Sequence, residues 1–156
     1  MSGELIDSAE IRARRILVID DEDANVLLLA SVLERQGFTD IHAITDPAAA
    51  LEAYVRLEPD LVLLDLMMPE VDGFQLLEAF KRHDRANEFR PVLVLTADST
   101  ISARRRALAL GAKDFVSKPF DVIEIALRIA NLLETRILYQ RLSDAFPATA
   151  RDPQAC

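Results

Sequence analysis

The sequence is poor in the features that mark several classes of protein. Its only cysteine, Cys156, is the last of 156 residues, so no internal disulfide can form and we expect a reducing, cytoplasmic environment. No apolar run approaches the roughly 20 residues that a membrane span needs. The opening "MSGELIDSAEIRAR" is polar and mixed in charge, unlike a secretory signal. These absences predict a soluble protein that makes no membrane contact.

Glycine and positive charge are also scarce. The chain has four glycines, and none lies in "DDEDANV", which follows the first apolar run. A P-loop or a dinucleotide-binding turn is therefore disfavoured. Lysine and arginine number 18 against 26 acidic residues, giving a net charge of −8 at pH 7, which argues against direct binding to nucleic acid. Hydrophobic residues make up 51% of the chain, enough for one packed domain.

Short apolar runs alternate five times with longer amphipathic segments. The predicted strands are 15–19, 40–45, 60–65, 91–96 and 113–117, and the predicted helices are 23–36, 46–57, 72–83, 99–111 and 121–142. The strands are apolar on both faces, which is typical of a parallel sheet covered by helices on both sides. We therefore predict an α/β doubly wound, five-stranded parallel sheet of order 2-1-3-4-5, flavodoxin-like, with an extended C-terminal helix.

Polar side chains follow four of the five predicted strands. Asp20 and Asp21 end the first strand, Asp65 the third, Thr96 the fourth and Lys118 follows the fifth. Each has an ordinary explanation alone, such as helix capping or a solvated surface charge. Parallel strands, however, deliver their carboxyl ends to one edge of the sheet, so these groups are expected to meet there.

Such a cluster predicts a specific chemistry. Two carboxylates about 4 Å apart repel by roughly 4 kcal/mol at an effective dielectric constant near 20, so three of them need a cation. Ligands that are all oxygens favour Mg²⁺ over Zn²⁺. A carboxylate beside the ion can attack a phosphoryl group. Thr96 can then donate a hydrogen bond to that group and Lys118 can offset its charge, which makes Asp65 the candidate phosphoacceptor.

The sequence resembles the receiver domain of two-component response regulators over residues 14–136. The matching segments are "ILVIDDE", "DLVLLDLMMPEVDGFQLL", "PVLVLTA" and "GAKDFVSKPF", in that order. The resemblance implies phosphoryl transfer from a sensor histidine kinase or a histidine phosphotransfer protein to Asp65. It implies a phosphorylatable signalling switch, with at most self-catalysed phosphorylation and dephosphorylation, rather than an enzyme. Residues 1–13 are expected to be disordered, and 137–156 to be a helix extension and disordered tail.

The resemblance also implies the metal ligands. Asp21 and Asp65 would bind Mg²⁺ directly, Asp20 would act mainly through water, and the backbone carbonyl of Met67 would be a further ligand.

Lys118 and Thr96 would hold the phosphoryl oxygens with the backbone N–H groups of Met67 and Ala97. The resemblance pairs Thr96 with an aromatic switch residue, Phe115, whose ring turns in when the phosphoryl group draws the hydroxyl inward. The Lys118–Pro119 bond is expected to be cis.

Two positions influence how water attacks the phosphoaspartate in this family. They are Met67 and Asp98. Met67 has no polar group to orient a water, which favours a long-lived phosphorylated state. Asp98 could orient a water or cap the next helix, so the net effect on lifetime is left open.

The predicted last helix, 121–142, is longer than its sheet requires. Past Leu133 it still carries Ile137, Leu138 and Leu142, so it either projects as a dimer contact or signalling helix, or bends back over its own domain. Asp114 and Arg128 match positions that form cross-dimer ion pairs in receivers. A homodimer would then use either the extended helix or the surface of 99–111, 113–117 and the start of the last helix.

Two alternatives to a phosphorylatable receiver remain. A haloacid-dehalogenase-type phosphatase would use Asp21 in "DEDAN" as its nucleophile, but the threonine that closes that motif and room for a cap domain are missing. A pseudo-receiver would be an interaction module without phosphorylation. No DNA-binding helix pair follows the last predicted helix, so the chain acts alone, as a relay or through a partner, or is a fragment.

Overall fold

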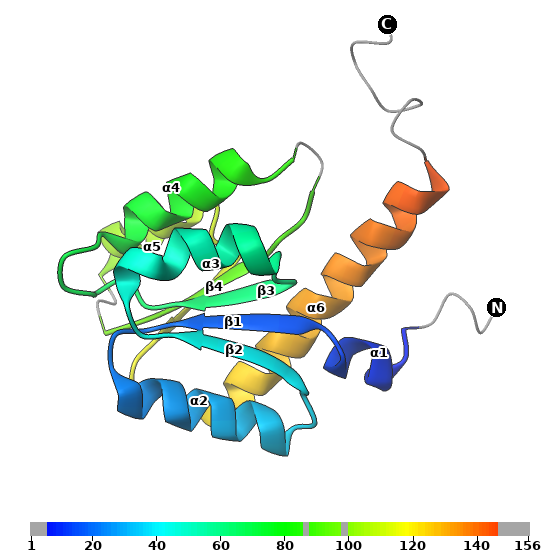
Figure 1. The fold of residues 1–156 in the computed structure, drawn as a ribbon, viewed down its shortest axis with the longest axis horizontal. Helices are drawn as coiled ribbons and strands as arrows, with labels where there is room; N and C mark the ends of the chain where they lie inside the picture. The colour runs from blue at the N-terminus through cyan, green and yellow to red at the C-terminus, as the bar shows by residue number, and fades with distance from the viewer. Residues whose placement is uncertain (1–5, 86–87, 98–99, 147–156) are drawn as a thin grey trace, which may run out of the picture.

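The computed structural model describes residues 6–85, 88–97 and 100–146. Its centre is a parallel sheet of order β2-β1-β3-β4-β5 (Figure 1), which confirms the predicted strand order. The strands are β1 (Arg15–Ile19), β2 (Asp40–Ile44), β3 (Leu61–Leu64), β4 (Val92–Thr96) and β5 (Asp114–Ser117). Each lies within the predicted range, because buried runs of β-branched and leucine residues mark strands clearly when both faces of the sheet are covered.

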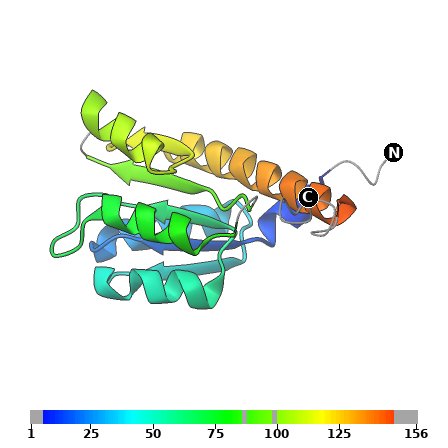
Figure 2. The ribbon, with the colours of Figure 1, turned by 90° about the horizontal axis from the view of Figure 1, so that it is seen from above.

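Helices cover both faces of this sheet. They are α1 (Ser8–Arg12), α2 (Asp23–Arg35), α3 (Ala50–Leu57) after a short 3₁₀ turn (Pro47–Ala49), α4 (Gly73–His83), α5 (Ile101–Ala109) and α6 (Val122–Ala145). The layers formed by α3, α4 and α5 and by α2 and α6 lie on opposite sides (Figures 1 and 2). Aspartates cap two of these elements: Asp46 accepts from the Ala48 N–H at the 3₁₀ turn, and Asp72 accepts from the Phe74 N–H at the start of α4.

Alternate residues of each central strand enter different halves of the core. In β1, Leu17 and Ile19 pack with α3 and α4, whereas Ile16 and Val18 pack with α2 and α6. All four side chains are essentially inaccessible to water. This two-sided burial explains why the strands lack a polar alternation, and it holds the carboxyl ends of the strands at one fixed edge.

The prediction that residues 1–13 are disordered is wrong for residues 8–12, which form α1. Asp7 caps this helix by accepting from the Ala9 N–H, and Ile11 is buried in the apolar cluster that also contains Ile137 of α6. A helix of five residues is not stable alone, so its contacts with α6 stabilise it. Residues 1–5, in the same predicted segment, lie outside the described residues.

The extension of α6 is attached to the domain instead of projecting freely or bending back. The helix runs for 24 residues to Ala145 and passes beside α1 (Figure 1). Arg136 is 5% exposed; its Nε lies 2.7 Å from Asp60, and its Nη1 donates to the Phe89 carbonyl at 2.8 Å. Farther along, Arg141 pairs with Glu10 of α1 at 2.7 Å.

We call this contact between α1 and the last turns of α6 the α1–α6 clamp. Arg14, just after α1, contributes by donating to Gln140 at 2.5 Å. Leu138 and Leu142 remain exposed beside the clamp. Of the segment 137–156, predicted to be a helix extension and disordered tail, residues up to Ala145 belong to α6, and residues 147–156 lie outside the described residues.

Candidate functional site

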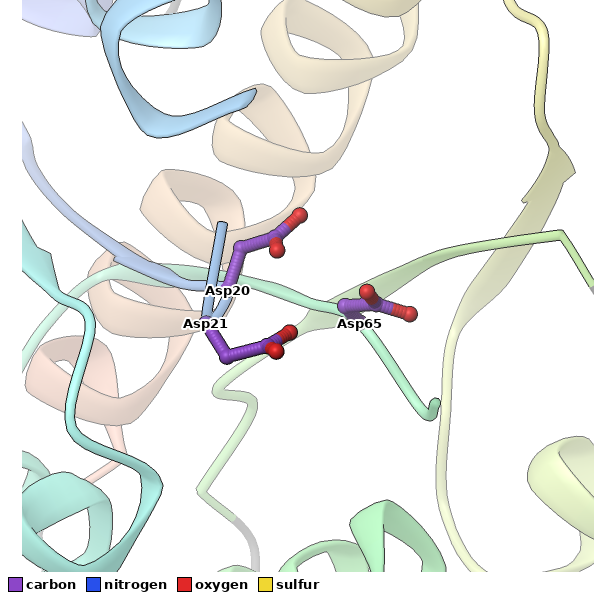
Figure 3. A group of neighbouring side chains, drawn as sticks. All are labelled: Asp20, Asp21 and Asp65. Carbon is purple, nitrogen blue, oxygen red and sulfur yellow. The ribbon is translucent and has the colours of Figure 1, made fainter. Parts of the chain in front are cut away.

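Three aspartates meet at the carboxyl edge of the sheet (Figure 3). Asp20 and Asp21 follow β1 and Asp65 follows β3, its neighbour in the sheet. One carboxylate oxygen of each lies within 4.8 Å of the others. Asp20 is 3% exposed and Asp65 5% exposed, while Asp21 is more open to solvent. The sequence predicted this convergence, and the parallel topology produces it.

Lys118 is the cation of the cluster. It follows β5, and its Nζ lies 3.2 Å from Asp20 and 3.3 Å from Asp65. Burial lowers the pKa of Lys118, but the two carboxylates outweigh burial and raise it above its ordinary value. The lysine is therefore charged and bridges carboxylates that come from different strands.

The surroundings of Asp65 make its own carboxylate costly to ionise. Burial is the largest cause that raises the pKa of Asp65, and the charge of Asp20 adds to it. The Met67 N–H, which donates to Asp65 at 3.0 Å, and Lys118 oppose this effect without cancelling it. One lysine does not compensate the group of three acids, so a further cation would stabilise their ionised form.

The donor set fits a hard divalent ion. The side chains that could bind a metal here, among the described residues, are the carboxylates of Asp20, Asp21 and Asp65. Oxygen ligands suit Mg²⁺ better than Zn²⁺. The backbone of Met67 adjoins Asp65 through its N–H, while its side chain is exposed. The role of the Met67 carbonyl as a ligand stays a prediction.

Two contacts of Asp20 were not predicted from the sequence. The Glu22 N–H donates to Asp20 at 3.0 Å, and the Asn25 side chain donates to it at 3.2 Å. Together with Lys118 they fix the orientation of this carboxylate. An asparagine in the first turn of the helix after an acidic strand end is the signal that could have identified Asn25.

The predicted switch residues lie next to this cluster. Thr96 is fully buried at the end of β4, and Phe115 is 7% exposed in β5. Phe115 pairs with Val94 and Thr96 with Ser117, so the side chains of Thr96 and Phe115 lie on the same face of the sheet. The Lys118–Pro119 bond is cis, as expected.

Ala97, whose N–H is predicted to bind phosphoryl oxygens, is exposed just after β4. Asp98, which is predicted to influence the attacking water, lies outside the described residues.

Asp114 and Arg128 pair within one chain. Arg128 lies 2.9 Å from Asp114 and 2.8 Å from Glu124. The prediction that Asp114 and Arg128 join two subunits is not tested by this pairing, and it stays a prediction.

Comparisons with known proteins identify the family. A family model of the response regulator receiver domain matches residues 16–130. The chain is 38% identical to the DNA-binding dual master transcriptional regulator RpaA of Synechocystis over 88% of this chain and 53% of that protein. It is 35% identical to the regulatory protein AtoC of Escherichia coli over 85% of this chain and 29% of AtoC. The chain thus spans about half, or less, of the length of these relatives.

Solved structures agree with this result. NtrX from Brucella abortus matches with a TM-score of 0.74 and 32% identity, over 85% of this chain and 30% of NtrX. The receiver domain of a LuxO repressor protein from Vibrio parahaemolyticus gives a TM-score of 0.76 over 83% of this chain and 97% of that chain; at 22% identity it shows the fold alone. The fold and the acidic edge of the sheet define the class of protein, a receiver-type domain of the flavodoxin-like α/β fold.

The chain belongs to the response regulator receiver domain family of two-component signalling systems. Within the described part of the chain, no helix combines the length and the apolar character needed to cross a membrane.

Proposed function

We propose that this receiver domain accepts a phosphoryl group on Asp65 from a sensor histidine kinase or a histidine phosphotransfer protein. The observation that carries the proposal is the position of Asp65: a nearly buried carboxylate, 3.3 Å from the Lys118 ammonium, in a group of three aspartates. Asp20, Asp21 and Asp65, with the Met67 carbonyl, would hold Mg²⁺. The ion, when bound, would neutralise charge on the carboxylates and on the transferred group.

The chain's own residues have distinct roles in the transfer. A carboxylate oxygen of Asp65 attacks the phosphorus atom, an O–P bond forms, and the P–N bond to the donor imidazole breaks with its electron pair leaving on nitrogen. Lys118 offsets the charge on the phosphoryl oxygens. The Thr96 hydroxyl and the N–H groups of Met67 and Ala97 donate hydrogen bonds to those oxygens.

Phosphorylation would then change the surface formed by α5, β5 and α6. Thr96 moves toward the phosphoryl group, and Phe115 repacks behind it on the same face of the sheet. The changed surface would bind an output partner or a second copy of the chain. A homodimer would use this surface, where Asp114 and Arg128 lie, or the exposed Leu138 and Leu142 of the α6 extension.

Intact-mass spectrometry after incubation with acetyl phosphate and Mg²⁺ tests the proposal. We expect the wild type and the control Glu70→Gln, an exposed acid near the site, to gain one phosphoryl group. Asp65→Asn and a Mg²⁺-free sample should gain none. Label that persists in Asp65→Asn but is lost in Asp21→Asn would contradict the proposal and favour phosphatase chemistry at Asp21. No label from either acetyl phosphate or a phosphorylated kinase would indicate a pseudo-receiver.

A further inference from the structure

An arginine of α5 covers the aromatic ring that the proposed switch would move. The guanidinium carbon of Arg104 lies 5.2 Å from the centroid of the Phe115 ring. The ring is 7% exposed, whereas Arg104 is exposed, so the guanidinium forms the outer layer over the ring. A cation at this distance from an aromatic face is attracted by the ring quadrupole.

Arg104 reaches the ring from a helix that is itself held in place. Two residues farther on, the Arg106 guanidinium carbon lies 4.1 Å from the centroid of the Phe74 ring at the start of α4. Ala107 is fully buried against the core on the same side of the sheet. Among the described residues no carboxylate forms an ion pair with Arg104, so the ring is its defined partner. The position of the guanidinium is therefore set by α5 and not by a competing acid.

We propose that Arg104 is a positioning residue of the switch, which holds Phe115 in its buried orientation before any phosphoryl group arrives. This inference rests on the proposed function, because it assigns a role in the switch beside Asp65. A ring that turns outward must displace the guanidinium or lose its contact with it. At the strength typical of cation–π contacts near a protein surface, loss of the cation changes the ratio of buried to outward rings about two- to fivefold.

The same contact should influence the phosphorylated state. In the proposed switch, Thr96 moves inward only when the Phe115 ring is buried. A ligand that mimics the phosphoryl group therefore binds more tightly to the molecules in which the ring is buried. By thermodynamic linkage, a substitution that lowers the ratio of buried to outward rings also weakens ligand binding. The fold-change in ligand affinity cannot exceed the fold-change in that ratio. Arg104 would thus set the fraction of molecules whose Phe115 ring is already buried before phosphorylation.

Substitutions within the arginine triplet of α5 offer matched variants. Arg104→Met keeps length but removes charge, and Arg104→Lys keeps a cation. Arg105→Met removes the same charge from the neighbouring exposed residue, which has no ring among its described contacts. The ring orientation is read from NMR cross-relaxation between Phe115 ring protons and the Thr96 methyl group, in the full chain with ¹³C-labelled phenylalanine and without Mg²⁺ or donor.

We expect the buried-to-outward ratio to fall two- to fivefold in Arg104→Met and to stay near the wild-type value in Arg104→Lys and Arg105→Met. In a titration with beryllofluoride and Mg²⁺, only Arg104→Met should bind more weakly, by no more than the same factor. An unchanged ring in Arg104→Met, or an equal change in Arg105→Met, would overturn the inference. The ring measurement needs no phosphoryl transfer, so a wild type that gains no phosphoryl group from acetyl phosphate or from a phosphorylated kinase contradicts the proposed function separately.

Discussion

Ile137 lies in the part of α6 that extends beyond the sheet, where the sequence left open whether the helix belongs to the domain. Its side chain is 1% exposed and packs in the cluster that contains Ile11 of α1 and Leu133 of α6. Its neighbour Leu138 is 49% exposed. Substitution of each by alanine therefore compares two aliphatic residues of equal size, one inside the α1–α6 clamp and one outside it.

The expected effects differ severalfold. Replacing a fully buried isoleucine by alanine costs about 2–5 kcal/mol, which includes the lost transfer free energy and the cavity left behind. The half-exposed Leu138 should cost roughly 0.5–1 kcal/mol, partly offset by the high helix propensity of alanine. With a urea dependence of about 2 kcal/mol per M, Ile137→Ala should lower the unfolding midpoint by about 1–2.5 M.

Urea unfolding of the full chain, followed by circular dichroism and by tyrosine fluorescence, measures both variants. A large shift for Ile137→Ala in one cooperative transition indicates that the extension unfolds with the domain. Equal small shifts for both variants would refute the reasoning, because they would mean that residues beyond Leu133 contribute nothing to domain stability. A separate early transition in the wild type would refute it in the same way.

Two further predictions concern other parts of the domain. Gly73→Ala should destabilise the fold by about 1–3 kcal/mol, because an added Cβ would lie 2.6 Å from the Leu66 Cα, and a melting temperature equal to the wild type would contradict this. Asp84 is the second case: burial, the largest cause, raises its pKa and the charge of Glu88 adds to this rise, while the hydrogen bond that the Tyr54 hydroxyl donates opposes it without cancelling it. The folded state therefore holds the proton to higher pH than the unfolded state, and this contribution to stability falls as pH rises from about 4 toward the raised pKa. Asp84→Asn should gain unfolding free energy relative to wild type from pH 4 to 7; a pH-independent difference would contradict this.

Much of the fold could be predicted because its signals are local. A buried strand needs an unbroken apolar run, and a capping residue such as Asp72 marks a helix start, so the order of the elements follows from a few neighbouring residues. Parallel topology then brings Asp20, Asp21 and Asp65 together without further information. The family comparison confirms the receiver fold, while the chemical roles of these residues await the labelling experiment.

The features that sequence reasoning missed depend on long-range contacts. Glu10 and Arg141 are 131 positions apart, and no local pattern links them. Arg136 reads as a solvent-facing charge in an amphipathic helix, yet it is buried because Asp60 and a backbone carbonyl satisfy its donors. Arg104 likewise reads as one of three surface arginines, and only the folded structure places it on a ring.

The anchored α6 helix has a mechanical consequence. It begins at the site edge, just after Lys118, and is pinned near the opposite edge where Arg136 meets Asp60. At 1.5 Å per residue, Val122 lies about 21 Å along the helix from Arg136, and Ala145 lies about 14 Å beyond it. Within this last stretch Arg141 pairs with Glu10, and Gln140 accepts a hydrogen bond from Arg14. Any tilt of α6 about Arg136 would therefore have to break these contacts or carry α1 with it.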